Sequence, residues 1–296
     1  MNTPRTIAEY LDQLRAALRG ADPAMIQDAL YDAEEHLRAE LAEQPGRSEQ
    51  DMLAHVVGSY GAPEEVAEIY RDQEIKIQRA LRPPQPPRRR TWIGRFFGVA
   101  ADARTWGALF YMVLALATGI FYFVWAVTGV SLSAGLAVLI IGIPFIILFL
   151  GTVRVLSLVE GRIVETMLGV RMPRRPPYTA RDTSLMKRIG MLFTDAHTWT
   201  TLFYMVLMLP LGIIYFTITI TLLSVAFSFI GAPAIYLMGD INLNLVYNDT
   251  HLDNPVLIGL ICLLGVVLLF ATLHLVRGLG KLHGYIAKHL LVPRGE

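Results

Sequence analysis

Three long stretches without a charged side chain constrain the fold of this chain more than any other feature. No Asp, Glu, Lys or Arg occurs in the 49 residues 105–153, the 44 residues 196–239 or the 23 residues 254–276. A helix crosses the hydrocarbon core of a bilayer with about 20 apolar residues, so these stretches hold several crossings. The sequence therefore predicts an all-α, polytopic membrane protein and excludes a soluble enzyme or a secreted domain.

Charge divides the chain into an acidic N-terminal part and a basic remainder. Residues 1–82 hold 16 acidic and 9 basic side chains, whereas residues 83–296 hold 17 basic and 9 acidic ones. Apolar residues recur every three to four positions after Thr6, after Asp22-Pro23, after Ser48 and again over residues 63–81, which indicates four amphipathic helices. Since no signal peptide precedes them, residues 1–82 are predicted to form a small cytosolic helical bundle.

A linker and a transmembrane body follow this bundle. Residues 83–90 read Pro-Pro-Gln-Pro-Pro-Arg-Arg-Arg, which favours a stiff extended structure there. They belong to a predicted juxtamembrane linker, residues 83–95, beside the inner membrane surface. The body, residues 96–296, contains two tandem repeats. Asp102-Ala-Arg-Thr-Trp106 with Leu109-Phe-Tyr-Met-Val-Leu114 returns, 93 residues later, as Asp195-Ala-His-Thr-Trp199 with Leu202-Phe-Tyr-Met-Val-Leu207. Asp102 and Asp195 are expected to cap the helices that follow them; a proton-responsive Asp195–His197 pair is the alternative.

Basic residues indicate how the body is threaded, because Lys and Arg are retained on the cytosolic side. They flank the apolar stretches at both chain ends and between the second and third, whereas the turn expected around Gly129–Ser133 has no charge. This pattern predicts four spans, near 106–128, 132–154, 199–222 and 256–277, with both termini inside. Residues 223–255 are then an outer segment that dips back into the membrane or lies on it. The Gly and Pro residues predicted to form hinges or a crevice are Gly142, Pro144, Pro210, Gly231 and Pro233.

Two families share motifs with this chain. The N-terminal part resembles the HAAS family in Tyr10-Leu11, in Tyr31-x-x-Glu34-Glu35-His36-Leu37 and in Tyr60-Gly61-Ala62-Pro63-Glu64-Glu65-Val66-Ala67. The body resembles a bacterial sensor family found joined to histidine kinases, through the duplicated Thr-Trp and Leu-Phe-Tyr and through Leu209-Pro210-Leu211-Gly212. HAAS domains occur beside PadR-like transcriptional regulators. The resemblances imply a signalling protein or scaffold of the bacterial inner membrane.

The search for catalytic and cofactor motifs is negative. The sequence lacks a phosphate-binding glycine loop, a nucleophile elbow, a zinc-protease motif and a paired Cys-x-x-Cys, and its one cysteine is Cys262. We expect no enzymatic activity, no cofactor, no metal and no direct contact with nucleic acid.

Three other groups of residues have a functional and a plain structural interpretation. The predicted outer loop contains Asp240, Asp249, His251 and Asp253. One interpretation is a site for a hard cation or a small ligand; the other is that these side chains only solvate the loop. An acidic partner-binding face is predicted from Tyr31, Glu34, Glu35, His36, Tyr60, Glu64 and Glu65, and ordinary solvation is the alternative. Trp92, Trp106 and Trp199 are expected to anchor helices at the membrane interface.

Two functions from different classes remain open on the sequence alone. The first is a non-enzymatic signalling adaptor or scaffold that senses an envelope or membrane cue and relays it through residues 1–82 to a cytosolic regulator or kinase. The second is a small transporter or channel component acting as a homo-oligomer, since internal repeats and broken helices are typical of transporters. Against the transporter, no charged residue lies within the predicted spans away from their ends.

Overall fold

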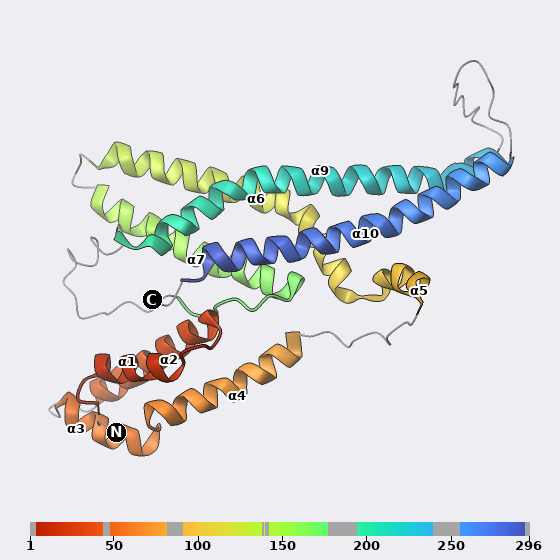
Figure 1. Ribbon diagram of the computed structural model, residues 1–296. Helices are drawn as coiled ribbons and strands as arrows, with labels where there is room; N and C mark the ends of the chain where they lie inside the picture. The colour runs from red at the N-terminus through yellow and green to blue at the C-terminus, as the bar shows by residue number, and fades with distance from the viewer. Residues whose placement is uncertain are drawn as a thin grey trace. The chain divides into compact units, whose positions relative to one another are not determined.

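The computed structural model describes residues 4–43, 48–81, 91–137, 139, 142–176, 194–238 and 255–293. Every regular element in these ranges is a helix, so the predicted all-α class is confirmed. Four short helices come first, and four long apolar helices follow (Figure 1). The predicted linker lies largely outside the described residues.

The first four helices are α1 (Ile7–Ala17), α2 (Pro23–Glu43), α3 (Glu49–Ser59) and α4 (Pro63–Leu81). Their starts follow from side-chain capping. Asp22 accepts the N–H of Ala24 at 3.0 Å, and Ser48 accepts the N–H of Asp51 at 3.2 Å. The start at Asp22-Pro23 and the start at Ser48 are therefore confirmed.

An apolar core holds these N-terminal helices together. Fully buried side chains from α1, α2 and α3 form its centre; the largest are Tyr10, Leu14, Leu37, Met52 and Leu53. The Tyr10 hydroxyl donates a hydrogen bond to the carbonyl of Gly61 at 2.9 Å, which ties α1 to the turn before α4. That turn needs a glycine, because φ at Gly61 is +112°.

The four long helices are α6 (Ala103–Leu136), α7 (Gly142–Leu168), α9 (Ala196–Met238) and α10 (Pro255–Leu291). A short helix, α5 (Trp92–Phe97), and a 3-10 turn, η1 (Gly98–Ala101), precede α6. All four long helices are long and apolar enough to cross a membrane. At 1.5 Å per residue, α7 spans about 40 Å and α9 about 64 Å, against about 30 Å of hydrocarbon. The chain is thus a multi-pass membrane protein.

The long helices depart from the predicted spans at two places. Residues 223–238 follow the predicted third span without a break, because α9 continues as helix through Gly231 and Pro233 to Met238. The first turn also comes later than the predicted Gly129–Ser133, since α6 runs on to Leu136. Gly129 is needed for packing instead. A methyl group there would lie 1.9 Å from the ring of Phe149 on α7.

The described residues group into two compact units, each treated separately below. The first compact unit comprises those within Met1–Arg82, Trp125–Met205 and Gly284–Glu296. The second comprises those within Pro83–Val124 and Val206–His283. In the second unit α6 and α9 cross at two glycines. A methyl group on Gly119 would lie 2.5 Å from the carbonyl oxygen of Met208, and one on Gly212 would lie 2.3 Å from that of Ala115. Only glycine permits so close a backbone crossing.

Candidate functional site

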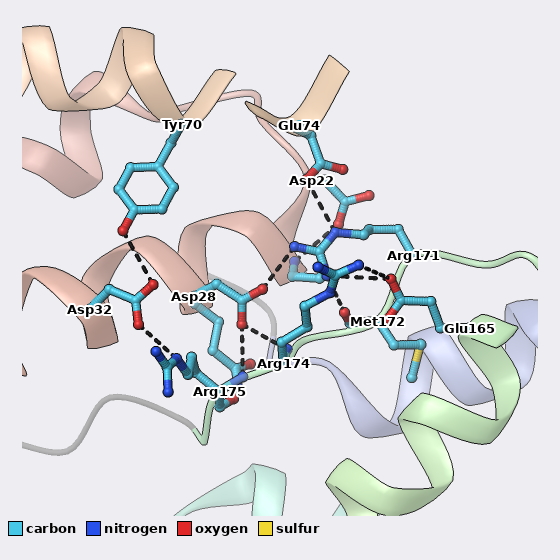
Figure 2. Close-up of polar contacts among 12 residues, drawn as sticks. Asp22, Asp28, Asp32, Tyr70, Glu74, Glu165, Arg171, Met172, Arg174 and Arg175 are labelled. Atoms are coloured by element: carbon cyan, nitrogen blue, oxygen red, sulfur yellow. Dashed lines mark hydrogen bonds and ion pairs between the residues drawn. The ribbon is translucent and has the colours of Figure 1, made fainter. Parts of the chain in front are cut away.

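The most polar buried region of the first compact unit lies where α7 ends. Gly169 has a φ of +69° and stops the helix, and its N–H bonds to the carbonyl of Glu165 at 3.1 Å. The chain then continues without helix through residues 170–176, Val-Arg-Met-Pro-Arg-Arg-Pro, called here the arginine segment. This segment lies against α2 and α4 of the N-terminal helices (Figure 2).

Arg171 is the centre of the contact. It is 7% exposed and extends between two carboxylates of the N-terminal helices. Its Nη2 donates to Asp28 on α2 at 2.7 Å, and its Nε donates to Glu74 on α4 at 3.1 Å (Figure 2). Its Nη1 donates to the carbonyl of Met172 and lies 3.9 Å from Glu165 on α7. One guanidinium therefore joins α2, α4 and the end of α7.

Asp28 also binds the main chain of the arginine segment. Its Oδ1 accepts the backbone N–H of Arg174 at 2.7 Å and that of Arg175 at 2.8 Å. The side-chain amide of the neighbouring Gln27 donates to the carbonyl of Arg175 at 2.5 Å. Together these bonds fix the segment on α2, where its main chain bends at Arg174 and Arg175.

The rim of the contact is more exposed. Arg175 pairs with Asp32 at 2.7 Å, and its guanidinium carbon lies 5.6 Å from the centre of the Tyr31 ring. The Tyr70 hydroxyl donates to the second oxygen of Asp32 at 3.3 Å. Burial, with the charges of Tyr60 and Asp32, raises the pKa of Tyr70, so its hydroxyl keeps the donated proton. We call Gln27, Asp28, Tyr31, Asp32 and Glu74 the acidic face.

Three further ion pairs surround the acidic face. Glu165 on α7, 2% exposed, accepts from Arg174 at 2.9 Å and from Arg162 at 3.2 Å. Lys288, near the end of α10, pairs with Asp22 at the start of α2 at 2.5 Å. The N-terminal helices are thus bound by charge to the ends of both α7 and α10.

Desolvation opposes charge attraction at the centre of this contact. Burial raises the pKa of Asp28, although Arg171 and the two backbone N–H groups act to lower it. Burial alone would lower the pKa of Arg171, but Asp28 and Glu74 raise it overall, so the guanidinium stays charged. A buried pair of this kind adds little net stability while both partners are present. Removing one partner leaves the other as an uncompensated buried charge, at a cost of about 3–5 kcal/mol.

An open pocket adjoins the contact. Its volume is about 350 Å³, and Gln73 and Ile77 of α4 line it together with Arg162 and the charged residues of the acidic face. Three carboxylates and four arginines line it, so their opposite charges nearly cancel. Among the residues that the structure describes, no three His, Cys, Asp or Glu side chains gather to hold a metal.

A second polar feature of the first compact unit ties α7 to the start of α9. Arg154 pairs with Asp195 at 3.2 Å, and the hydroxyl of Tyr204 donates to Glu160 at 2.9 Å. Glu160 is 1% exposed. Asp195 also caps α9 by accepting the N–H of His197 at 3.0 Å, which confirms the capping interpretation of this residue.

The second compact unit contains the same kind of tie between α6 and α10. Arg277 pairs with Asp102 at 2.7 Å, and the Tyr111 hydroxyl lies 2.5 Å from Nε2 of His283. Asp102 caps α6 through the N–H of Arg104 at 3.0 Å, as predicted. In both ties an Asp–Arg pair is followed by a buried tyrosine that bonds an ionisable side chain.

The structure distributes the predicted partner face among different roles. Tyr31 lies in the acidic face, but Glu34 is buried and pairs with Arg38 at 2.8 Å. The His36 and Tyr60 rings stack at 4.3 Å, and Glu65 caps the turn by accepting the N–H of Ala62 at 3.0 Å. The side chains of His36, Tyr60 and Glu65 therefore support the local fold. Glu35 and Glu64 are exposed and remain predictions.

The other predicted site residues fall outside these contacts. Asp240, Asp249, His251 and Asp253 lie outside the described residues. Gly142 begins α7, Pro144 lies in its first turn, and Pro210, Gly231 and Pro233 lie inside α9, so a hinge role for them stays a prediction. The interface tryptophans Trp92, Trp106 and Trp199 are 77%, 52% and 54% exposed, as anchors facing a bilayer would be.

Sequence reasoning missed Asp28, Asp32, Glu74 and Arg171. One signal was present. Asp28 and Asp32 are four residues apart on α2 and so share one face of that helix. The arginines at 171, 174 and 175 were explained by membrane topology alone.

Comparison with protein families gives two matches. Residues 111–291 match the Sensor family, described as "Putative sensor", and residues 9–69 match the HAAS family. No curated protein and no solved structure matches the chain.

Proposed function

This chain belongs to the Sensor family and carries a HAAS domain at its N-terminus, and on that premise we propose that it is a non-enzymatic signalling adaptor. The membrane helices would receive a membrane or envelope cue. The HAAS domain would pass it to a cytosolic regulator or kinase. The observation that carries this proposal is the arginine segment bound to the acidic face, because it gives the HAAS domain a specific contact with the end of a membrane helix.

The contact suits a relay because it depends on a few directional bonds. Asp28 alone accepts three of them, from the side chain of Arg171 and from the backbone N–H groups of Arg174 and Arg175. A shift at the end of α7 that breaks this geometry would remove several bonds together. A small movement of a membrane helix would then become a change between a bound and a released HAAS domain.

We further propose that the body is a tandem repeat. The two polar ties occupy corresponding positions. Asp102 and Tyr111 precede Asp195 and Tyr204 by 93 residues, and Arg154 and Glu160 precede Arg277 and His283 by 123. The glycine crossing is also reciprocal, since Gly119 and Ala115 lie 93 residues before Gly212 and Met208. Each repeat's first helix would then be tied to the other repeat's second helix.

The proposed location is the bacterial inner membrane with both chain ends in the cytosol. Four spans place both ends on one side. The basic residues at 88–90, 95 and 104, and those from Arg154 to Arg188, fall on that same side. The arginine segment and the HAAS domain are then in one compartment, as their contact requires.

Affinity capture from native membranes tests the proposal. Full-length protein, a variant lacking residues 1–82 and the variant Arg171→Gln would be compared by mass spectrometry. We expect a cytosolic regulator that requires residues 1–82 and whose recovery changes several-fold with Arg171→Gln. Recovery of the protein alone from all three would contradict the adaptor and favour a homo-oligomeric pore, which solute flux in proteoliposomes would then show.

A further inference from the structure

The arginine segment is held on the acidic face in the way that a peptide ligand is held by its receptor. It is not helical, it bends at Arg174 and Arg175, it follows a glycine stop, and it contributes both main-chain and side-chain groups to the contact. The N-terminal helices contribute only side chains: a carboxylate and an amide to the main chain, and further carboxylates and an aromatic ring to the arginines.

The bonds define what such a face recognises. Asp28 and Gln27 bind backbone groups at residues 174 and 175, so they accept any residue except proline at these two positions in this conformation. Specificity comes from two arginines, one buried between Asp28 and Glu74 and one on Asp32 and Tyr31. The recognised pattern is therefore a short non-helical segment with arginines four residues apart, as Arg171 and Arg175 are.

Access to the face is uneven. The side chains of Arg175 and Asp32 are 48% and 32% exposed, whereas those of Arg171 and Asp28 are 6% and 9% exposed. The open pocket beside Arg171 and Tyr70 widens this accessible side. A second basic segment can thus approach at Asp32 before the resident segment has left Asp28.

We propose that the acidic face is a binding site for short basic segments of a cytosolic protein partner, and that the arginine segment is its resident, competing occupant. The inference rests on the proposed function and specifies its partner. The cue that moves the end of α7 removes the resident segment. The partner then inserts an Arg-x-x-x-Arg segment in its place, so binding is blocked while the HAAS domain is docked on its own chain.

The probe is a labelled peptide of residues 169–176, Gly-Val-Arg-Met-Pro-Arg-Arg-Pro, with blocked ends. Its binding to full-length protein in uncharged phosphatidylcholine nanodiscs is followed by fluorescence anisotropy. In the wild type the resident segment competes at a high effective concentration. In the variant Arg171→Gln/Arg175→Gln the resident has lost both recognised side chains. We expect the peptide to bind this variant at least tenfold more tightly than the wild type.

Two controls establish that the peptide occupies the acidic face. Adding Asp28→Asn to the double variant should weaken binding at least tenfold. Adding Glu68→Gln, which removes one exposed negative charge elsewhere on α4, should change it less than twofold. A peptide with both recognised arginines replaced by glutamine should not bind.

A second measurement keeps the test valid if the double variant unfolds. In the wild type, excess peptide should accelerate hydrogen exchange at the backbone N–H groups of Arg174 and Arg175, because their acceptor on Asp28 is taken by the peptide. Equal peptide affinity for wild type and double variant, or binding indifferent to Asp28→Asn, would overturn the inference. The adaptor proposal itself would stand or fall separately, on the capture of a regulator through residues 1–82.

Discussion

The N-terminal helices use different chemistry on their two sides. Their interior is apolar, with Leu14 and Leu37 fully buried and Tyr10 as its one hydrogen-bonded member among the largest side chains. Their acidic face is ionic, with Arg171 buried among carboxylates. An apolar core tolerates small shifts because it is not directional. An ionic contact needs both partners in place, since either one alone is an unpaired buried charge.

This difference indicates a division of roles. The apolar core stabilises the fold of the HAAS domain. The acidic face adds little net stability and a strict geometric requirement. We infer that the apolar core keeps the HAAS domain folded and that the acidic face decides whether the domain is docked on the arginine segment. Mutations in the core and mutations in the acidic face should therefore have separate effects.

The largest expected effect is the loss of docking in Arg171→Gln. Asp28 and Glu74 would keep their buried charges without a partner, at a cost of about 3–5 kcal/mol. Hydrogen exchange at the backbone N–H groups of Arg174 and Arg175 should rise at least about a hundredfold, the factor that corresponds to about 3 kcal/mol. Exchange within α1, away from the contact, should stay as it is. Unchanged exchange in the arginine segment, or loss of protection throughout α1, would contradict the separation of roles between the acidic face and the apolar core.

Leu37→Ala tests the apolar side. Truncating a fully buried leucine costs about 2–5 kcal/mol, and protection should fall across α1, α2 and α3 together. Docking should weaken only as a consequence of this loss of structure. Protection that falls in the arginine segment while the core stays protected would contradict the proposed separation. Native-state hydrogen exchange of the full chain measures both regions in one experiment.

Arg175→Gln measures the rim of the ionic contact. Both side chains of the Arg175–Asp32 pair are partly exposed, so solvent screening limits its contribution to about 0.2–1 kcal/mol. Exchange at the backbone N–H of Arg174 should rise no more than about fivefold, and most of this effect should vanish in high salt. A loss as large as that in Arg171→Gln would show that the rim and not the buried arginine controls docking.

The smallest expected effect is on the alkaline titration of the Tyr10 hydroxyl in the apolar core. Burial, with the charges of Tyr60, Glu64 and Glu65, raises the pKa of Tyr10 above its ordinary value of 10.0. The folded state thus holds this proton more tightly than the unfolded state, so the stabilisation is complete below pH 10 and is lost as the pH rises further. The difference in tyrosinate absorbance between wild type and Tyr10→Phe should titrate above pH 10. A midpoint of this absorbance difference at or below pH 10 would contradict the raised pKa of Tyr10. The control is Tyr285→Phe, which removes an exposed tyrosine.

The sequence predicted the helices better than the contacts. Capping residues and apolar periodicity act locally, so Asp22, Ser48 and Asp102 correctly marked helix starts. Gly129 misled because glycine serves turns and close packing alike, and here the Phe149 ring needs the space. Pro233 lies inside α9, which continues to Met238 without ending at this proline.

The candidate site was beyond local reasoning for a different reason. Asp28 and Arg171 are 143 residues apart in the chain. The sequence around each of them contains no pattern that indicates the other as its partner. Arginines beside a membrane span already have a sufficient explanation in topology, which hid their second role. The acidic residues that the motif emphasised, Glu34 and Glu65, proved to serve internal pairs and caps.

Photo-cross-linking from position 31 tests the central claim most directly. A benzophenone amino acid in place of Tyr31 keeps an aromatic ring on the acidic face, and the Arg175 guanidinium carbon lies 5.6 Å from the native ring centre. Irradiated in native membranes and mapped by mass spectrometry, the full-length protein should give an internal cross-link to residues 170–176 that Arg171→Gln strongly reduces. A cross-link pattern without this segment, or one indifferent to Arg171→Gln, would contradict docking of the HAAS domain on the arginine segment.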